Sequence, residues 1–310
     1  MLSPFKSSPT GTPRSFARTF IGLLTTGALA LGLTACSSSG EDDGSLGTIT
    51  FGYQESWPDG VAMAYLLEPE LEEMGYTVEH ETIPDTPALF VAVAEGDVTM
   101  YPSAWIESGA KEYYEKYQDK LESVGGYFKN ARITLNVPEY VEDINSVEDL
   151  KGQGDRFDGR IVGIEPGTGM AQTIDSEMIP EYGLEGEYEQ ITSSTAAMLS
   201  ELDKAVDKEE PIVVSLWRPY WANVVYPVKA LEDPKNIFAP ETLHMVANSE
   251  WVQDNPELVD WLGEIKMTTE EQGELENLIV NEYKDDPAKA VEEWTADHPD
   301  FFPQHPDLDA

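Results

Sequence analysis

Short apolar stretches alternate with amphipathic ones from residue 48 to the end of the chain. In residues 48–53 the apolar side chains of Ile49 and Phe51 lie two positions apart, which is the period of a strand with one buried face. In residues 194–206 an apolar face recurs every three or four positions, as in a helix packed on a core. The members of that face are Ala197, Met198, Leu202 and Ala205. These two periods predict where strands and helices lie.

The same pattern extends along the chain, with Ser146 and Asp149 placed as a helix-capping pair. Pro69 falls inside a predicted helix and is expected to kink it or to end its first part. Strands are expected at residues 48–53, 76–83, 97–101, 132–137, 160–165, 188–192, 211–216 and 243–247. Helices are expected at residues 61–74, 86–95, 107–117, 146–150, 169–182, 194–206, 256–265, 269–282 and 287–296. Strands separated by helices predict an α/β fold with mainly parallel sheets.

The part of the chain that follows residue 47 is long enough for two lobes. About 260 residues suit two packed lobes better than one large core. Lobe 1 is predicted at residues 48–137 and 239–310, and lobe 2 at residues 138–238. The chain would cross between the lobes near residues 136–140 and 226–238. Ligands of α/β sheets bind at the carboxyl ends of strands, so a ligand is expected in the cleft between the lobes.

The first residues have the pattern of an export signal. Lys6, Arg14 and Arg18 precede an apolar stretch that is too short for a comfortable membrane span. The stretch ends in Leu-Thr-Ala-Cys at Cys36, which resembles the bacterial lipobox. The prediction is a lipoprotein signal peptide at residues 1–35, lipid on Cys36 and a flexible tether at residues 36–47. The alternative is an ordinary secretory signal with a chance cysteine. Cys36 is the single cysteine, so the chain has no intramolecular disulfide.

The composition is strongly acidic, with 59 Asp and Glu against 19 Lys and Arg and a formal net charge of −40. Binding to nucleic-acid phosphates needs a basic surface, so a nucleic-acid partner is excluded. With so many acids in the chain, the simplest interpretation of each Asp or Glu is a solvated surface group.

No catalytic or metal-binding motif stands out. The Gly167-Thr168-Gly169 segment lacks the third glycine of a dinucleotide-binding loop, and residues 143–149 lack the glycine of a calcium loop. The histidines have no metal-ligand spacing and are His80, His244, His298 and His305. We therefore predict that the protein is not an enzyme and has no cofactor or metal. A secreted hydrolase or an adhesive surface lipoprotein remains the alternative from another class.

Tryptophans gather at the ends of predicted strands. Trp57 and Trp105 follow strands of the first lobe, and Trp217 and Trp221 follow a strand of the second. A single tryptophan after a strand is usually core, but several at equivalent strand ends of two lobes indicate one cleft. The tryptophans of the helical tail are better interpreted as core residues and are Trp251, Trp261 and Trp294.

Clustered indoles fit one class of ligand. A trimethylammonium group carries positive charge and no N–H, so aromatic faces bind it where ordinary hydrogen bonds cannot. A desolvated contact contributes ~2 kcal/mol, so three faces approach the roughly 8 kcal/mol of micromolar binding. The strand-to-helix segment at residues 164–172 offers glycines and free helix N–H groups to an anionic end of the same ligand.

Several stretches of the chain resemble the glycine betaine/proline betaine substrate-binding proteins of ABC importers. They are Gly52-Tyr53 to Trp57, Ser103-Ala104-Trp105, Gly163-Ile-Glu-Pro-Gly-Thr-Gly169, Ser193-Ser-Thr-Ala-Ala-Met198 and Pro211-Ile-Val-Val-Ser-Leu-Trp-Arg-Pro-Tyr-Trp221. The resemblance implies a two-lobed periplasmic-binding fold, a type II clamshell with two hinge crossings. It also implies a monomer on the extracytoplasmic face of the membrane, which delivers its ligand to an ABC permease with a separate ATPase.

The resemblance also implies site residues. Trp57, Trp105 and Trp217 would form a tryptophan cage, and the backbone amides of Gly169 and Met170 would hold a carboxylate. Further ligand-binding residues expected in the same motifs are Tyr53, Thr168 and Trp221.

The chain departs from the family pattern at two positions. Trp57 is four residues after Tyr53, where the family usually has three, and Ala110 occupies a position at which some members carry a ligand-binding histidine. The hypothesis is osmoprotective uptake of glycine betaine. The same role for choline, carnitine, proline betaine or ectoine is the alternative.

Overall fold

The computed structural model describes residues 46–284 and 286–308. The predicted signal peptide at residues 1–35, the lipid site at Cys36 and most of the tether at residues 36–47 lie outside the described residues. Within the described part, the strands form one sheet in the order β2-β1-β3-β9-β4-β7-β5-β6, with β8 paired to β4. The strands are β1 (Thr48–Tyr53), β2 (Thr77–Thr82), β3 (Met100–Ala104), β4 (Leu121–Pro138), β5 (Arg160–Val162), β6 (Glu189–Ile191), β7 (Val214–Arg218), β8 (Val228–Ala230) and β9 (Glu241–Asn248).

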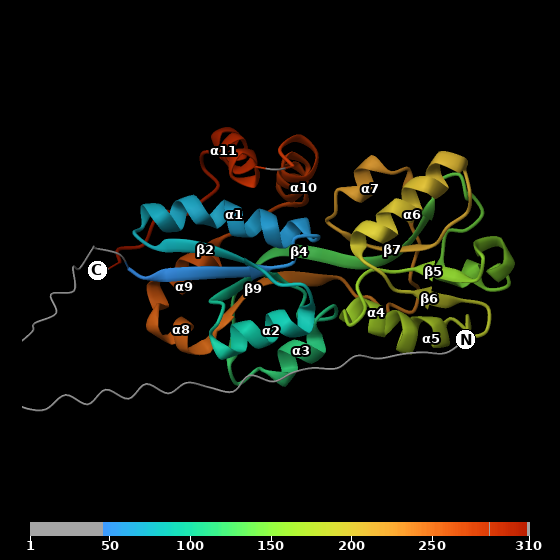
Figure 1. The fold of residues 1–310 in the computed structure, drawn as a ribbon, viewed down its shortest axis with the longest axis horizontal. Coiled ribbons are helices and arrows are strands. Elements are labelled where there is room, and N and C mark those ends of the chain that lie inside the picture. Colours follow the sequence, from blue (N-terminus) through green and yellow to red (C-terminus); the bar gives the residue numbers. More distant parts are fainter. Residues whose placement is uncertain (1–45, 285, 309–310) are drawn as a thin grey trace, which may run out of the picture. The chain divides into compact units, whose positions relative to one another are not determined.

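Helices cover both faces of this sheet (Figure 1). Figure 1 shows α1, α10 and α11 on one face of the β2–β1 end and α2 and α3 on the other; at the β5–β6 end, α6 and α7 lie opposite α4 and α5. The α-helices are α1 (Pro58–Glu73), α2 (Thr86–Glu95), α3 (Lys111–Lys116), α4 (Gly169–Thr173), α5 (Ile179–Glu181), α6 (Thr195–Lys208), α7 (Ala222–Val225), α8 (Ser249–Asp254), α9 (Pro256–Glu264), α10 (Thr269–Asn277) and α11 (Pro287–Asp297). The 3-10 turns η1 (Val147–Leu150) and η2 (Gly154–Phe157) and the π turns η3 (Ile174–Met178) and η4 (Leu278–Glu282) complete the list.

The sheet is mixed, whereas the sequence predicted mainly parallel pairing. The pairs β1–β2, β1–β3, β5–β6 and β5–β7 are parallel, as expected of strands joined by helices. The pairs β3–β9, β4–β9, β4–β7 and β4–β8 are antiparallel. Antiparallel pairing enters because β4 and β9 run the opposite way to the strands beside them.

β4 joins the two ends of the sheet. Its first part pairs with β9 as far as Ala131, and its second part pairs with β7 from Arg132 on. The chain thus passes from one end to the other a few residues before the crossing predicted at residues 136–140. The division into two lobes at the predicted boundaries stays a prediction.

Local sequence signals set several helix ends. Asp85 accepts the Ala88 N–H to begin α2, and Gly96 ends it at a φ of 80°, as the pattern predicted. The predicted capping pair of Ser146 and Asp149 is present in η1. α1 begins earlier than predicted and continues past Pro69, so that proline does not end the helix.

Candidate functional site

Three tryptophans from separate strands line one cavity. Trp57 follows β1, Trp105 follows β3, and Trp217 lies within β7, not after it as predicted. The cavity has a volume of about 40 Å³ and is partly open to solvent. Its lining residues are Trp57, Asp59, Thr86, Tyr101, Trp105, Gly109, Ala110, Ile133, Ile164, Thr168, Met170 and Trp217. Aromatic and aliphatic side chains therefore make most of its wall.

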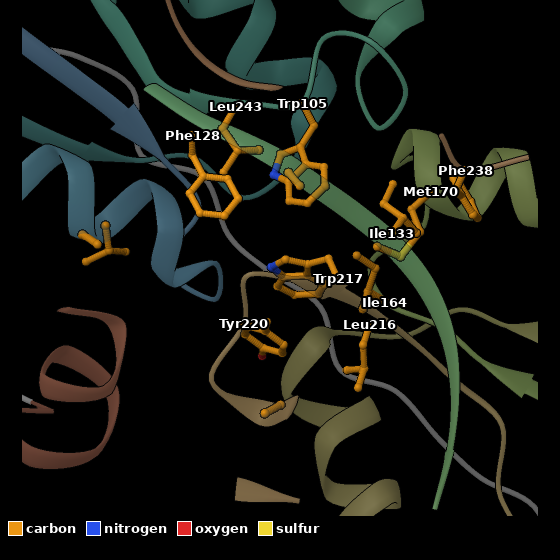
Figure 2. Packing of buried hydrophobic residues seen from close by; sticks show 14 of the residues in the cluster. Trp105, Phe128, Ile133, Ile164, Met170, Leu216, Trp217, Tyr220, Phe238 and Leu243 are labelled. Atoms are coloured by element: carbon orange, nitrogen blue, oxygen red, sulfur yellow. The ribbon is translucent and has the colours of Figure 1, made fainter. Parts of the chain in front are cut away.

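The indole of Trp217 is fixed between other rings. Its ring stacks on Tyr220 with centroids 3.9 Å apart, and the edge contact with Trp57 has centroids 6.5 Å apart. In Figure 2, Trp217 lies between Trp105 and Tyr220. Ile133, Ile164 and Met170 are also drawn there. The buried Tyr220 thus supports one face of Trp217 and leaves the other toward Trp105.

Trp105 is held by a buried carboxylate. Its indole N–H donates to Asp59 Oδ2 over 3.2 Å, and the Ser103 hydroxyl donates to the same oxygen over 2.6 Å. Asp59 lies in the first turn of α1, is 2% exposed and lines the cavity. Burial raises the pKa of Asp59, while the hydrogen bonds from Ser103 and Trp105 oppose the rise. The cavity wall therefore contains a buried carboxyl group that holds its proton more tightly than an exposed one.

Asp59 is a residue that sequence reasoning missed. An acid among 59 acids was interpreted as a solvated surface group. The available signal was its place two residues after Trp57, in the first turn of a helix that starts at a strand end.

Trp57 follows β1, is partly buried, and makes a hydrogen bond to a residue at the β5–β6 end of the sheet. Its indole N–H donates to Thr195 Oγ1, at the first residue of α6, over 3.3 Å. The residue that departs from the family spacing is therefore oriented by a specific hydrogen bond.

The segment predicted to hold an anionic group begins α4. Thr168 and Met170 line the cavity, and the Thr168 hydroxyl caps the helix by accepting the Ala171 N–H over 3.1 Å. Gly169 and Met170 are the first residues of α4, where backbone N–H groups have no partner within the helix. Gly169 itself packs on the backbone of Gly109, since a Cβ atom there would lie 2.1 Å from the Gly109 oxygen.

Two predicted site residues lie elsewhere. Tyr53 and Trp221 line a second, larger hollow between α1, α6 and η4. The Tyr53 hydroxyl is 3.2 Å from His80 Nδ1, and burial raises its pKa. Ala110 does line the cavity with the three tryptophans.

The cavity wall contains one acidic side chain, that of Asp59, and no basic side chain among the described residues. Among residues 46–284 and 286–308, no group of three or more His, Cys, Asp or Glu could hold a metal ion. In the same part of the chain, no helix is both long enough and apolar enough to cross a membrane.

Comparison with known families identifies the relationship. Residues 47–297 match the family described as the substrate binding domain of ABC-type glycine betaine transport system. The chain belongs to this family. Members of this glycine betaine transport family bind substrates for transport and are not enzymes, as the sequence predicted.

Curated relatives carry related names. The chain is 34% identical over 152 residues to the glycine betaine/carnitine transport binding protein GbuC of Listeria monocytogenes, covering 48% of this chain. The chain spans about half (50%) of the length of GbuC. It is 24% identical over 228 residues to the glycine betaine/proline betaine-binding periplasmic protein of Escherichia coli, with 62% of this chain and 68% of that protein covered.

Solved structures confirm the predicted fold class. The glycine betaine, L-proline ABC transporter binding protein ProX of Borrelia burgdorferi aligns with a TM-score of 0.74 at 27% identity, covering 83% of this chain and 97% of that one. Lactococcal OpuAC, in a closed-liganded conformation complexed with glycine betaine, aligns with a TM-score of 0.74 at 27% identity, covering 81% and 96%. This member of the glycine betaine transport family thus has the α/β fold of the type II periplasmic binding proteins.

Proposed function

We propose that this chain is the extracytoplasmic substrate-binding component of an ABC importer and that it captures a quaternary-ammonium solute. The observation that carries the proposal is the arrival of Trp57, Trp105 and Trp217 at one cavity from three strands. Family membership supports the transport role. The ligand would be bound between the two ends of the sheet and released to a membrane permease, with no chemistry on the ligand.

The cage would bind the methylated cation through its charge and its methyl groups. Aromatic faces attract the spread positive charge and bury the methyls at the same time. The carboxyl group of Asp59 adds a negative charge to the same wall once it ionises. A protonated amine would instead require several hydrogen-bond acceptors, and the described wall offers few beside its rings.

Glycine betaine is the ligand we propose first. Its carboxylate would accept hydrogen bonds from the Gly169 and Met170 N–H groups at the start of α4, beside the Thr168 hydroxyl. A methylated cation and a carboxylate on one small molecule fit the two kinds of wall. GbuC and lactococcal OpuAC, named for or solved with glycine betaine, support this choice.

Choline is a second candidate, favoured by the charge of the wall. Ala110 supplies no donor for a ligand carboxylate, and Asp59 would repel one when ionised. Choline is a net cation with a hydroxyl group and no carboxylate, so it needs no carboxylate donor and is not repelled by Asp59. Carnitine, proline betaine and ectoine complete the set of solutes for the test.

The lipid anchor on Cys36, the extracytoplasmic location and the monomeric state belong to the same proposal. A diacylated cysteine would hold the binding domain near its permease through a short tether. Mass spectrometry of the membrane-bound protein, with Cys36→Ser as the control, tests the anchor.

A thermal-shift panel tests the ligand class. Each solute is added to the purified chain from residue 46 on, with glycine as the control that lacks the methyl groups. A true ligand at a hundred times its dissociation constant stabilises the native state by about 2.7 kcal/mol and raises the melting temperature. A shift with glycine betaine or choline and none with glycine supports the proposal. A flat panel across all methylated cations contradicts it.

A further inference from the structure

A hydrogen-bonded group centred on Glu165 connects the two ends of the sheet next to the cavity. Glu165 follows β5, Thr195 begins α6, and Ser56 and Trp57 follow β1. Glu165 is not part of the cavity wall, although Ile164 before it is. Any effect of its carboxylate on the cavity would therefore have to pass through other residues.

A chain of hydrogen bonds connects Glu165 to Trp57. The Thr195 backbone N–H donates to Glu165 Oε1 over 2.9 Å, and the Thr195 hydroxyl donates to Oε2 over 2.7 Å. The Ser56 hydroxyl donates to Oε1 over 3.4 Å, and the Trp57 indole N–H donates to Thr195 Oγ1 over 3.3 Å.

The order of donors matters because a hydroxyl has one proton. Since Thr195 gives its proton to Glu165, the lone pairs of its oxygen are left to accept the indole N–H of Trp57. An ionised carboxylate can only accept, so it fixes this orientation. A neutral amide at position 165 could donate to the hydroxyl and turn its proton toward Trp57.

We infer that Glu165 is a positioning residue of the cage: through Thr195 and Ser56 it holds Trp57 against the ligand and slows ligand release. The inference rests on the proposed function. The bonds join a loop at the β1 end to a loop and a helix at the β5–β6 end. They can form only while these ends are together, so their loss acts mainly on the dissociation rate.

A purely structural role for Glu165 is the competing explanation. Its carboxylate lies at the first N–H of α6, where a negative charge also stabilises the helix. A capping role alone would alter the melting temperature and leave ligand release unchanged. Dissociation kinetics therefore separate the two roles.

The experiment compares Glu165→Gln, Thr195→Val and Thr195→Ser by stopped-flow tryptophan fluorescence, with glycine betaine and choline as the ligands. Thr195→Ser keeps the hydroxyl and Thr195→Val removes it at nearly constant shape. We expect Glu165→Gln and Thr195→Val to raise the dissociation rate about tenfold, as for the loss of one charge-assisted hydrogen bond, with the association rate little changed. Thr195→Ser should release ligand like the wild type.

Glu201→Gln is the matched control. Glu201 is an acid of α6, the helix that Thr195 begins. It lies 3.1 Å from Arg160 in a half-exposed ion pair and is outside the cavity wall. Wild-type dissociation rates in both Glu165→Gln and Thr195→Val would overturn the inference, as would a Thr195→Ser variant as fast as Thr195→Val. If Glu165→Gln does not fold, the two Thr195 variants decide. If the wild type binds neither solute, the proposed function fails instead.

Discussion

The indole N–H of Trp105 donates a hydrogen bond of 3.2 Å to the buried carboxyl group of Asp59. Both residues line the same cavity, so one aromatic face and one potential negative charge are fixed to each other. Ser103 donates to the same oxygen, so Asp59 Oδ2 accepts two side-chain hydrogen bonds. Because burial raises the pKa of Asp59, we expect ligand binding at this site to depend on pH.

The first prediction is that choline binds more tightly as the pH rises. Burial raises the pKa of Asp59, so the empty site holds a proton over a range above the ordinary value, and a bound cation favours its loss. Affinity should increase with pH until Asp59 is ionised in the free protein. Calorimetry in two buffers of different ionisation enthalpy measures the released proton. Asp59→Asn should weaken binding and remove the pH dependence, whereas a wild type with constant affinity and no proton release would contradict this role.

The second prediction concerns Glu276, a fully buried acid of α10. Gln272 Nε2 donates to its Oε1 over 2.9 Å, and burial, followed by the nearby Asp59, raises the pKa of Glu276 from 4.5 to about 8. Between these values the native state binds a proton that the unfolded state has lost. The free energy of unfolding therefore falls as the pH rises through this window, and levels off above about 8.

Urea unfolding at about pH 6 and about pH 8 checks this expectation. The free energy of unfolding of the wild type should be roughly 2 kcal/mol lower at the higher pH, because each unit of pKa difference corresponds to ~1.4 kcal/mol. Glu276→Gln keeps a neutral polar group in place and should lose much less. Equal slopes in the two proteins would show that Glu276 is not the group that titrates.

The third prediction concerns the close approach of Gly169 to Gly109. A Cβ atom at position 169 would lie 2.1 Å from the Gly109 oxygen, so Gly169→Ala must push α4 away from the loop after Trp105. Calorimetry should show at least about a tenfold loss of affinity, or roughly 1.4 kcal/mol. Gly273→Ala is the control, since a Cβ atom there meets nothing within 4 Å and alanine should stabilise α10 by ~0.5–1 kcal/mol. Unchanged binding by Gly169→Ala would mean that this contact does not shape the site.

Much of the fold follows from local patterns, and long-range features do not. The order of strands and helices could be predicted because each has its own period, as in β1 and α6. The first part of β4 was missed because Gly125 and Gly126 interrupt its pattern. Gly125 is required by a distant helix, since a Cβ atom there would lie 2.8 Å from Gly263 Cα.

The residues of the candidate site likewise fall into those that the sequence could predict and those that it could not. Trp57, Trp105 and Trp217 could be placed near one another because strand ends of an α/β fold meet at one edge. Glu276 could not be found, since its burial depends on packing and nothing local separates it from the surface acids. Asp59 was missed for the same reason, although its place two residues after Trp57 was an available signal. The roles of all these residues in ligand binding stay predictions.

The most direct test of the cage is calorimetric titration of Trp105→Ala and Trp217→Ala with glycine betaine and choline, beside Trp251→Ala. Trp251 lies on α8, outside the cavity wall, and is partly buried like Trp57. The account predicts that both cage variants fold but lose at least about 2 kcal/mol of binding free energy, the value of one desolvated aromatic contact, while Trp251→Ala binds like the wild type. Wild-type affinity in both cage variants would contradict the proposal that these indoles bind the ligand.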